Sequence, residues 1–524
     1  MGPRSFISPF NPAARQAKID QAGAPVRLRD SVCSIVRCVA LMKRVFSNPL
    51  AALTAGLCLR LFFVLKFPAN SGDTVLYEQI ATNWLKHHVY AMTVGGQITP
   101  VDLRMPGYPA FLVIIYLLTG RTGADARTGV LLAQIGVDLL SCLVIARLAA
   151  LLASTSLDSA PNKRAYSMAL WLAALCPFTA NYTAVPLTEV FASWWTGLAC
   201  CPLVLALRRV KKPDFLVTES HLPRPRSVEY TALVGGLTAG VGTLFRPETP
   251  ILLFAAAMVF GGLFFLRSFR RWLSTGLAMA LGGFLVLSPW ALRNWMTLGE
   301  PQFLAPKNSN LPGELVPNGF MAWEKTWLYR VRDCYLMPWK LNEEAISVED
   351  IPTRAFDTPE EKQHVAMILE QYNNDLTLTP DEDVAFAQLA RQRVARHPWR
   401  TYLWLPAARA VTIWFTPRIE LLPVSGHVFP LPQMREDDPV DQQVTILFFV
   451  LNLFYVGLGV WGALRLWRSN PAARPVVAFL GLFMALRTAF LTTLETPEPR
   501  YVLVCFPALI ALGAQVLTRR SEVR

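Results

Sequence analysis

Long apolar runs separated by short polar segments dominate this chain. Because a helix needs about 20 mostly apolar residues to cross the hydrocarbon core of a bilayer, each such run predicts one transmembrane helix. About ten runs qualify, and they predict an all-α polytopic membrane protein. Their approximate spans are 46 to 68, 128 to 153, 165 to 184, 187 to 207, 229 to 246, 249 to 267, 273 to 291, 443 to 465, 475 to 494 and 500 to 518.

Two further apolar stretches, at 106 to 119 and 400 to 416, are predicted to be juxtamembrane helices at the membrane interface. The first is short for a span, and the second is interrupted by Arg400, Pro406 and Arg409. Counting either one alone as a span would reverse the sidedness of every loop that follows it. The predicted topology therefore depends on this interpretation.

Lys and Arg gather in the short loops on one side of the ten-span topology, and the positive-inside rule assigns that side to the cytoplasm. Both termini then lie in the cytoplasm. The Lys and Arg residues in these loops account for the net charge of +13, so this charge does not indicate nucleic acid as a partner. The basic residues on this side are Lys43, Arg44, Lys163, Arg164, Arg208, Arg209, Lys211, Lys212, Arg267, Arg270, Arg271, Arg465, Arg468, Arg474, Arg519 and Arg520.

The topology divides the chain into five parts. They are a cytoplasmic tail at 1–44, a transmembrane core at 45–292 with its first outward loop at 69–127, an outward segment at 293–441, the last transmembrane helices at 442–518 and a second cytoplasmic tail at 519–524. A linker containing Pro and Arg, at 214–227, lies on the cytoplasmic side. In the outward segment, Thr358 and Thr379 each open a capping box with Pro at the first helical position. This segment is predicted to be a small helical subdomain.

Carboxylates stand at the outward ends of several predicted helices. Asp73 follows the first span and opens a helix, where an N-cap is the simplest structural role. Glu189 lies at the outward start of the fourth span, where a carboxylate is costly unless it is paired, hydrated or bound to a ligand. The alternative for Glu189 is a helix-start charge favoured by the helix dipole. Glu248 recurs at the same level, and its neighbour Arg246 offers it an ordinary ion pair.

Arg104, Arg293 and Arg500 lie on the same outward side, where the topology disfavours positive residues. A bound phosphate would explain the set, because guanidinium binds phosphate oxygens in a bidentate fashion. For each Arg alone, an ion pair with a nearby acid such as Glu300 or Glu498 is the alternative. Together, the acids and cations suit sugar transfer from a lipid-linked phosphate: the cations hold the leaving phosphate and a carboxylate takes the proton of the acceptor hydroxyl.

The order of these motifs carries a family resemblance. They are Asp73 after the first span, Arg104-Met105-Pro106-Gly107-Tyr108-Pro109, Leu187-Thr188-Glu189, Arg246-Pro247-Glu248, Pro289-Trp290-Ala291-Leu292-Arg293-Asn294 and Arg500-Tyr501 before an apolar helix. The set resembles the bacterial GT-C glycosyltransferases, and within them the group of protein mannosyltransferases and aminoarabinose transferases. The resemblance covers roughly residues 45–300 and the last helix.

Two departures from the wider family bear on the acceptor. Asp73 stands between Gly72 and Thr74, whereas eukaryotic protein mannosyltransferases carry an Asp-Glu pair at this place. The chain also has Trp194-Trp195-Thr196 where oligosaccharyltransferases have Trp-Trp-Asp. Both departures argue against protein as the acceptor.

The resemblance implies a GT-C fold and an inverting transfer from a polyprenyl-phosphate sugar to a lipid, glycan or protein acceptor. It implies a multi-pass protein of the bacterial inner membrane whose site faces the periplasm. Asp73 would be the general base and Glu189 the second acid, and a divalent metal ion held by these two acids is left open. Arg104, Arg293 and Arg500 would hold the donor phosphate. Further site candidates are Tyr77, Glu78, Tyr108, Arg246, Glu248, Asn294 and Tyr501.

A flippase or transporter of lipid-linked sugars is the alternative function. Such a protein is expected to show repeated halves, broken helices and charges near the bilayer midplane. The site candidates of this chain instead lie at span ends. Arg60, Asp138 and Arg487 are the exceptions that fall within spans, and we interpret Arg60 and Asp138 as a buried structural pair.

Overall fold

The computed structural model of the protein describes residues 47–154, 162–210, 226–264, 268–306, 314–429, 434–435 and 437–518. By its internal contacts the chain divides into two units, Met1–Ala51 and Ala52–Arg524, and nearly all described residues belong to the second unit. Most of the linker at 214–227 lies outside the described residues, as do Lys43, Arg44, Lys211, Lys212, Arg267, Arg519 and Arg520.

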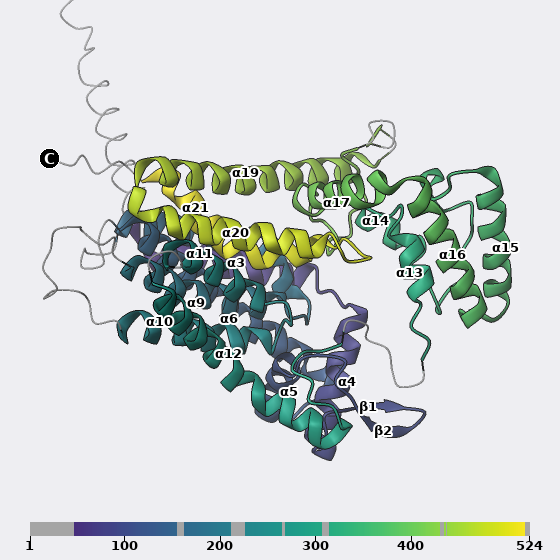
Figure 1. The fold of residues 1–524 in the computed structure, drawn as a ribbon, viewed down its shortest axis with the longest axis horizontal. Coiled ribbons are helices and arrows are strands. Elements are labelled where there is room, and N and C mark those ends of the chain that lie inside the picture. Colours follow the sequence, from purple (N-terminus) through teal and green to yellow (C-terminus); the bar gives the residue numbers. More distant parts are fainter. Residues whose placement is uncertain are drawn as a thin grey trace, which may run out of the picture. The chain divides into compact units, whose positions relative to one another are not determined.

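Helices make up most of the described chain (Figure 1), and the protein is an all-α polytopic membrane protein, as the sequence predicts. Seven helices of the described chain are long and apolar enough to cross a membrane. The core helices are α3 (Pro49–Lys66), α6 (Arg127–Ala153), α7 (Lys163–Ala174), α9 (Glu189–Arg209), α10 (Arg226–Thr243), α11 (Pro250–Phe264), α12 (Phe269–Leu298), α19 (Pro439–Ser469), α20 (Arg474–Leu491) and α21 (Phe506–Gly513). Helix α21 continues the 3-10 helix η7 (Pro499–Cys505) and runs on into η8 (Ala514–Leu517).

The third predicted span is not one continuous helix. Helix α7 ends at Ala174, and the chain continues as the short α8 (Pro177–Asn181) and the 3-10 turn η2 (Tyr182–Ala184). Pro177 has no N–H to continue α7 and stands instead at the first position of α8. Arg60 fills the break, since its Nη1 donates to the Ala174 carbonyl at 2.8 Å and its Nε to Asp138 at 2.7 Å. The prediction of an unbroken span was wrong, whereas the buried Arg60–Asp138 pair is confirmed.

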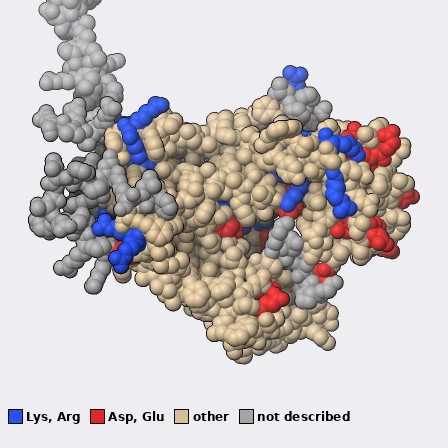
Figure 2. Space-filling view, viewed as in Figure 1, with Lys and Arg blue, Asp and Glu red and all other residues tan. Residues whose placement is uncertain are grey.

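Large apolar side chains cover the outside of the core helices. On α19 alone, more than half of each side chain is exposed for Leu447, Val450, Phe454, Val460 and Trp461. Figure 2 shows a surface almost without Lys, Arg, Asp or Glu over the middle of this helix. A soluble protein rarely leaves so large an apolar area open to water, whereas a bilayer covers it.

Two basic residues that the sequence assigns to one side each bind a backbone carbonyl at the end of a neighbouring helix. Arg208 at the end of α9 donates to the carbonyl of Ser154 after α6. Arg465 on α19 donates to the carbonyl of Thr518 after η8 at 2.8 Å. The first residues of α9 and η7, at the opposite ends of these helices, include site candidates.

The predicted first outward loop, residues 69–127, contains the 3-10 helix η1 (Gly123–Ala126) and three larger elements. They are α4 (Gly72–His87), an antiparallel hairpin of β1 (Ala91–Val94) and β2 (Gln97–Pro100), and α5 (Gly107–Thr119). The predicted juxtamembrane stretch at 106 to 119 is thus a helix of 13 residues. The hairpin was not predicted, although Gly95 and Gly96 supply the two positive φ angles of its tight turn.

Residues 314–429 contain the predicted helical subdomain. Its helices are α13 (Asn318–Glu324), α14 (Val331–Cys334), α15 (Pro359–Asp375) and α16 (Pro380–Arg396). Thr358 and Thr379 cap α15 and α16 as predicted, and Trp323, Trp327 and Phe386 contribute to a separate apolar core. Figure 2 shows Asp and Glu gathered over α15 and α16. The second juxtamembrane stretch is the π-helical turn η5 (Arg400–Trp404) followed by α17 (Leu405–Trp414).

Helices α10 and α12 approach each other so closely that one contact point requires glycine. A Cβ atom at Gly236 would lie 2.1 Å from the carbonyl oxygen of Met279. Gly236→Ala should therefore lower the melting temperature in detergent micelles, since overpacking of this kind costs about 1–3 kcal/mol. Gly276→Ala on α12 is the matched control, because no atom lies within 4 Å of its new methyl group. Equal melting temperatures for the two variants would contradict the close packing.

Candidate active site

Asp73 is the second residue of α4, and Ser71 is the residue that caps this helix. The Ser71 hydroxyl accepts a hydrogen bond from the N–H of Asp73 at 3.3 Å. In return, the Thr74 hydroxyl accepts one from the N–H of Ser71. The Thr74 hydroxyl also donates to the Pro186 carbonyl at 3.2 Å, which fixes the start of α4 beside the segment that leads into α9. The N-cap role considered for Asp73 is therefore filled by Ser71, and the Asp73 carboxylate makes other contacts.

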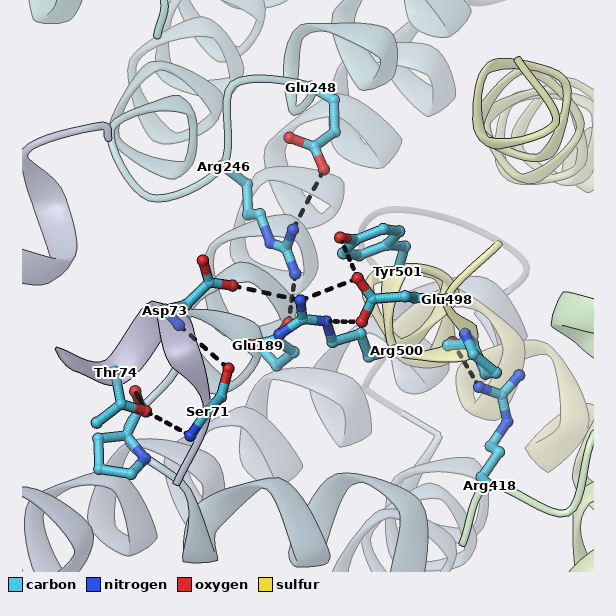
Figure 3. Close-up of polar contacts among 12 residues, drawn as sticks. Ser71, Asp73, Thr74, Glu189, Arg246, Glu248, Arg418, Glu498, Arg500 and Tyr501 are labelled. Carbon is cyan, nitrogen blue, oxygen red and sulfur yellow. Dashed lines mark hydrogen bonds and ion pairs between the residues drawn. The ribbon is translucent and has the colours of Figure 1, made fainter. Parts of the chain in front are cut away.

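Each oxygen of the Asp73 carboxylate accepts a hydrogen bond from a different guanidinium. Arg104 Nη2 lies 2.6 Å from Oδ1, and Arg500 Nη2 lies 3.3 Å from Oδ2 (Figure 3 shows the contact with Arg500). Burial by itself would raise the pKa of Asp73, but the positive charges of Arg104 and Arg500 outweigh it and hold this pKa below its ordinary value. Asp73 is thus ionised at neutral pH.

Glu189 and Glu248 surround a second guanidinium, that of Arg246. Arg246 Nη2 lies 2.5 Å from Glu189 Oε1, and its Nη1 lies 3.6 Å from Glu248 Oε1 (Figure 3). Glu248 is also bound by Arg487 of α20 at 3.0 Å. Burial would raise the pKa of Glu248, but Arg487 and Arg246 outweigh it and lower that pKa. Arg246 Nε and Glu189 Oε2 are both buried and have no hydrogen-bond partner among the residues that the structure describes.

Arg500 connects the two groups of charges. Its Nε lies 3.8 Å from Glu189 Oε1 and 2.6 Å from Glu498 Oε2, in addition to the contact with Asp73. The Tyr501 hydroxyl donates to Glu498 Oε1 at 2.7 Å, and the guanidinium of Arg246 lies 5.0 Å from the centre of the Tyr501 ring. The complete network contains four acids and four guanidiniums, namely Asp73, Glu189, Glu248 and Glu498 with Arg104, Arg246, Arg487 and Arg500.

Most residues of this network line a cavity of about 610 Å³. Six charged side chains face it, those of Asp73, Arg104, Glu189, Arg246, Glu248 and Arg500. Its remaining wall is mostly apolar and includes Leu187, Phe245, Ile251, Phe490 and Leu494. A cavity with a charged floor and apolar walls fits a ligand that carries both an anionic group and a hydrocarbon chain.

Tyr77 and Tyr501 complete the predicted residues that line the cavity. The Tyr77 ring lies 5.0 Å from that of Tyr108 in an edge-to-face contact. Burial raises the pKa of Tyr77 to about 12, so its hydroxyl stays protonated and can act as a hydrogen-bond donor. Eight of the twelve predicted site residues thus meet at one cavity.

Four predicted site residues do not line the cavity. Arg293 donates to the carbonyls of Tyr90 and Val101 at 2.7 and 2.8 Å, so it holds the base of the hairpin. The prediction that Arg293 binds donor phosphate is therefore not retained. The other three have local partners as well: Asn294 donates to the Gln302 carbonyl, Glu78 accepts two bonds from Arg127, and Tyr108 donates to Gln134.

The carboxylates do not form a convincing site for a divalent metal ion. Both oxygens of Asp73 already accept bonds from guanidiniums, as does Oε1 of Glu189. The part of the chain that the structure describes contains no cluster of three His, Cys, Asp or Glu side chains that could ligate one. Arg104, Arg246 and Arg500 would also repel a cation at this place. We therefore derive no step through a metal ion.

No family model and no curated protein matches the chain. Among solved structures, the oligosaccharyltransferase AglB of Archaeoglobus fulgidus, in complex with an inhibitory peptide and a dolichol-phosphate, is similar with a TM-score of 0.46 and 13% identity, over 90% of this chain and 50% of that chain. ArnT of Cupriavidus metallidurans bound to undecaprenyl phosphate is similar with a TM-score of 0.31 and 12% identity, over 89% of this chain and 77% of that chain.

The present chain spans about half the length of the AglB chain.

Arg246→Ala should destabilise the protein, because it leaves the Glu189 side chain, which is only 2% exposed, with its main counter-charge removed. Loss of one partner of a buried ion pair costs about 3–5 kcal/mol. The double variant Glu189→Gln with Arg246→Ala should recover much of that loss, since the unpaired charge is gone. Thermal unfolding in detergent micelles measures both. Equal stability of Arg246→Ala and the unmodified protein would show that the pair is not buried as described.

Proposed function

We propose that the protein is a membrane glycosyltransferase that moves a sugar from a polyprenyl-phosphate donor to a hydroxyl group of a lipid, glycan or protein acceptor. One observation carries the proposal. The Asp73 carboxylate, whose side chain is 27% exposed, lines a partly apolar cavity together with the two guanidiniums that bind it. A base and two phosphate-binding cations at one cavity are what transfer from a lipid-linked phosphate requires.

In the proposed reaction, Asp73 is the general base. It takes the proton of the acceptor hydroxyl while the hydroxyl oxygen attacks the anomeric carbon of the donor sugar. The bond from this carbon to the phosphate oxygen breaks, and the phosphate leaves with the bonding electrons on the opposite face. The configuration at the anomeric carbon is therefore inverted.

Arg104 and Arg500 are proposed to hold the donor phosphate and the charge that develops on it as it leaves. Both contact Asp73 and lower its basicity. A bound phosphate would draw these guanidiniums toward itself and add a negative charge near the carboxylate. Both effects raise the pKa of Asp73, so donor binding makes the base stronger.

Glu189 takes a binding role in this proposal. Its Oε1 accepts a hydrogen bond from Arg246, while its Oε2 is buried and has no partner within the described part of the chain. A buried acceptor without a partner costs free energy, and a hydroxyl of the donor sugar would satisfy it. Arg246 Nε, which also lacks a hydrogen-bond partner, could donate to a sugar oxygen.

We further propose that the cavity opens on the outward, periplasmic side of an inner membrane. The support is the distribution of charge along the helices, since Arg208 and Arg209 end α9 whereas Glu189 begins it at the cavity. By the positive-inside rule, the basic ends face the cytoplasm. The cavity then lies on the other side.

Asp73→Asn should reduce transfer by about 100- to 10,000-fold, because the variant keeps the shape of the side chain and removes the base. Purified protein would be supplied with a panel of labelled polyprenyl-phosphate sugars and candidate acceptors, and the transferred label would be counted. Asp102→Asn is the matched control, since Asp102 lies in the same outward loop but does not line the cavity.

Two outcomes would overturn the proposal. Full transfer by Asp73→Asn would remove Asp73 from the chemistry. Movement of the intact lipid-linked sugar across vesicles, with no transfer product, would favour the flippase alternative.

The pH dependence of transfer tests the coupling between phosphate and base. In the free enzyme the pKa of Asp73 lies below its ordinary value, so kcat/KM should stay constant down to a pH below about 4 and fall as Asp73 becomes protonated. In the donor complex that pKa is higher, so the acid limb of kcat should lie at higher pH than that of kcat/KM.

Arg104→Gln provides the comparison for this profile. It removes the larger of the two positive influences on Asp73, so the acid limb of kcat/KM should move upward. The coupling would be contradicted if the acid limbs of kcat and kcat/KM lay at the same pH in the unmodified enzyme and Arg104→Gln left the limb of kcat/KM unmoved. The guanidiniums would then not control the pKa of Asp73.

A further inference from the structure

The segment 492–501, which follows α20 and includes the first residues of η7, brings Leu494, Arg500 and Tyr501 to the cavity. Most of this segment has no regular secondary structure before η7 begins at Pro499. Its few internal backbone hydrogen bonds include those from the N–H groups of Glu498 and Tyr501. The position of Arg500 therefore depends on what holds the segment from outside.

Two cations, Arg409 of α17 and Lys325 directly after α13, bind the first half of the segment. Arg409, which is 3% exposed, donates from Nη1 to the Thr492 carbonyl at 3.2 Å. Lys325 Nζ lies 2.7 Å from Glu495 Oε1. Arg409 also donates to the Lys325 carbonyl at 2.7 Å, so the two contacts form one connected unit.

Arg418 binds the second half, at the residue next to Arg500. Its Nη1 donates to the Pro499 carbonyl at 2.7 Å (Figure 3), while its Nε and Nη2 donate to Asn452 Oδ1 and the Ile413 carbonyl. Each of its three guanidinium nitrogens thus donates to a different element, and the side chain is only 3% exposed. This is a fixed support rather than a solvent-facing charge.

The backbone of Arg418 has a positive φ of 58°. A bulky residue adopts this conformation only where its surroundings enforce it, and such strain is concentrated at functional positions. In this conformation the guanidinium donates to the Pro499 carbonyl. A residue without this side chain would gain nothing from the strained turn.

We infer that Arg418 is a positioning residue, which sets the place of Arg500 in the cavity by fixing the neighbouring Pro499 carbonyl. Residues of the segment 325–418 thus help to position Arg500, although none of them lines the cavity. The role of Arg500 as a phosphate-binding residue rests on the proposed function, whereas the anchoring of residues 492–501 does not.

Hydrogen exchange followed by mass spectrometry tests the anchoring without a substrate. In Arg418→Ala, the amides of residues 492–505 should exchange about tenfold faster, which is the factor that loss of one hydrogen bond to a charged group is worth. Arg400→Ala is the matched control, because Arg400 belongs to the same outward segment and pairs with Asp357 at 2.6 Å. Arg418→Lys keeps the charge and one of the three donor nitrogens, so it should show a smaller effect. It also covers the case in which the alanine variant does not fold.

Binding of undecaprenyl phosphate tests the connection to Arg500. Arg418→Ala and Arg500→Ala should each weaken binding about tenfold in detergent micelles, and the double variant should be no weaker than Arg500→Ala alone. Additive losses would contradict action through Arg500.

The two measurements separate the inference from the proposed function. Unchanged exchange at residues 492–505 in both Arg418 variants would overturn the inference. Faster exchange, combined with unchanged undecaprenyl phosphate binding in Arg500→Ala, would support the anchoring and count against a phosphate-binding role for Arg500.

Discussion

The structure of the site depends on one contact, in which the Asp73 carboxylate is shared between Arg104 and Arg500. These residues come from the start of α4, the loop before α5 and the start of η7. Partly buried charges are tolerated only when each has a partner, so the three elements must end at the same place. The apolar helices are free to pack in many ways, but this requirement selects the arrangement in which their polar ends converge.

The need for a partner of opposite charge also applies to the residues around this contact. Arg500 also needs Glu498 and Glu189, and Glu189 in turn needs Arg246. Each charge is compensated by the next, so the cavity has no excess of either sign among its six charged lining residues. Such a site can admit an anion only by rearranging the pairs that it already contains.

Apolar patterning was enough to predict most of the fold, because a span is defined by length and hydropathy alone. Thr358 and Thr379 likewise predicted two helix starts, since capping is a local interaction. The break after Ala174 was missed because the residues on both sides of it are apolar, and only Pro177 signals it. Its stabilisation depends on Arg60, which lies far away in the sequence.

The site was predicted only in part, for a related reason. Arg293 and Arg500 look alike in the sequence, since each is predicted to lie on the outward side at the end of a span. Arg293 nevertheless binds backbone carbonyls, whereas Arg500 reaches the cavity. No local signal separates them. Arg487 and Arg418 act through contacts with other elements, and the sequence offers only their occurrence at apolar or irregular positions as a hint.

The balance of charge in the cavity has a consequence for the end of the catalytic cycle. On the proposed chemistry the donor is a phosphodiester with one negative charge, and the spent carrier is a monoester whose charge approaches two. The guanidiniums of Arg104 and Arg500 therefore attract the product more strongly than the substrate. Departure of the lipid carrier, rather than formation of the glycosidic bond, then becomes the natural bottleneck of turnover.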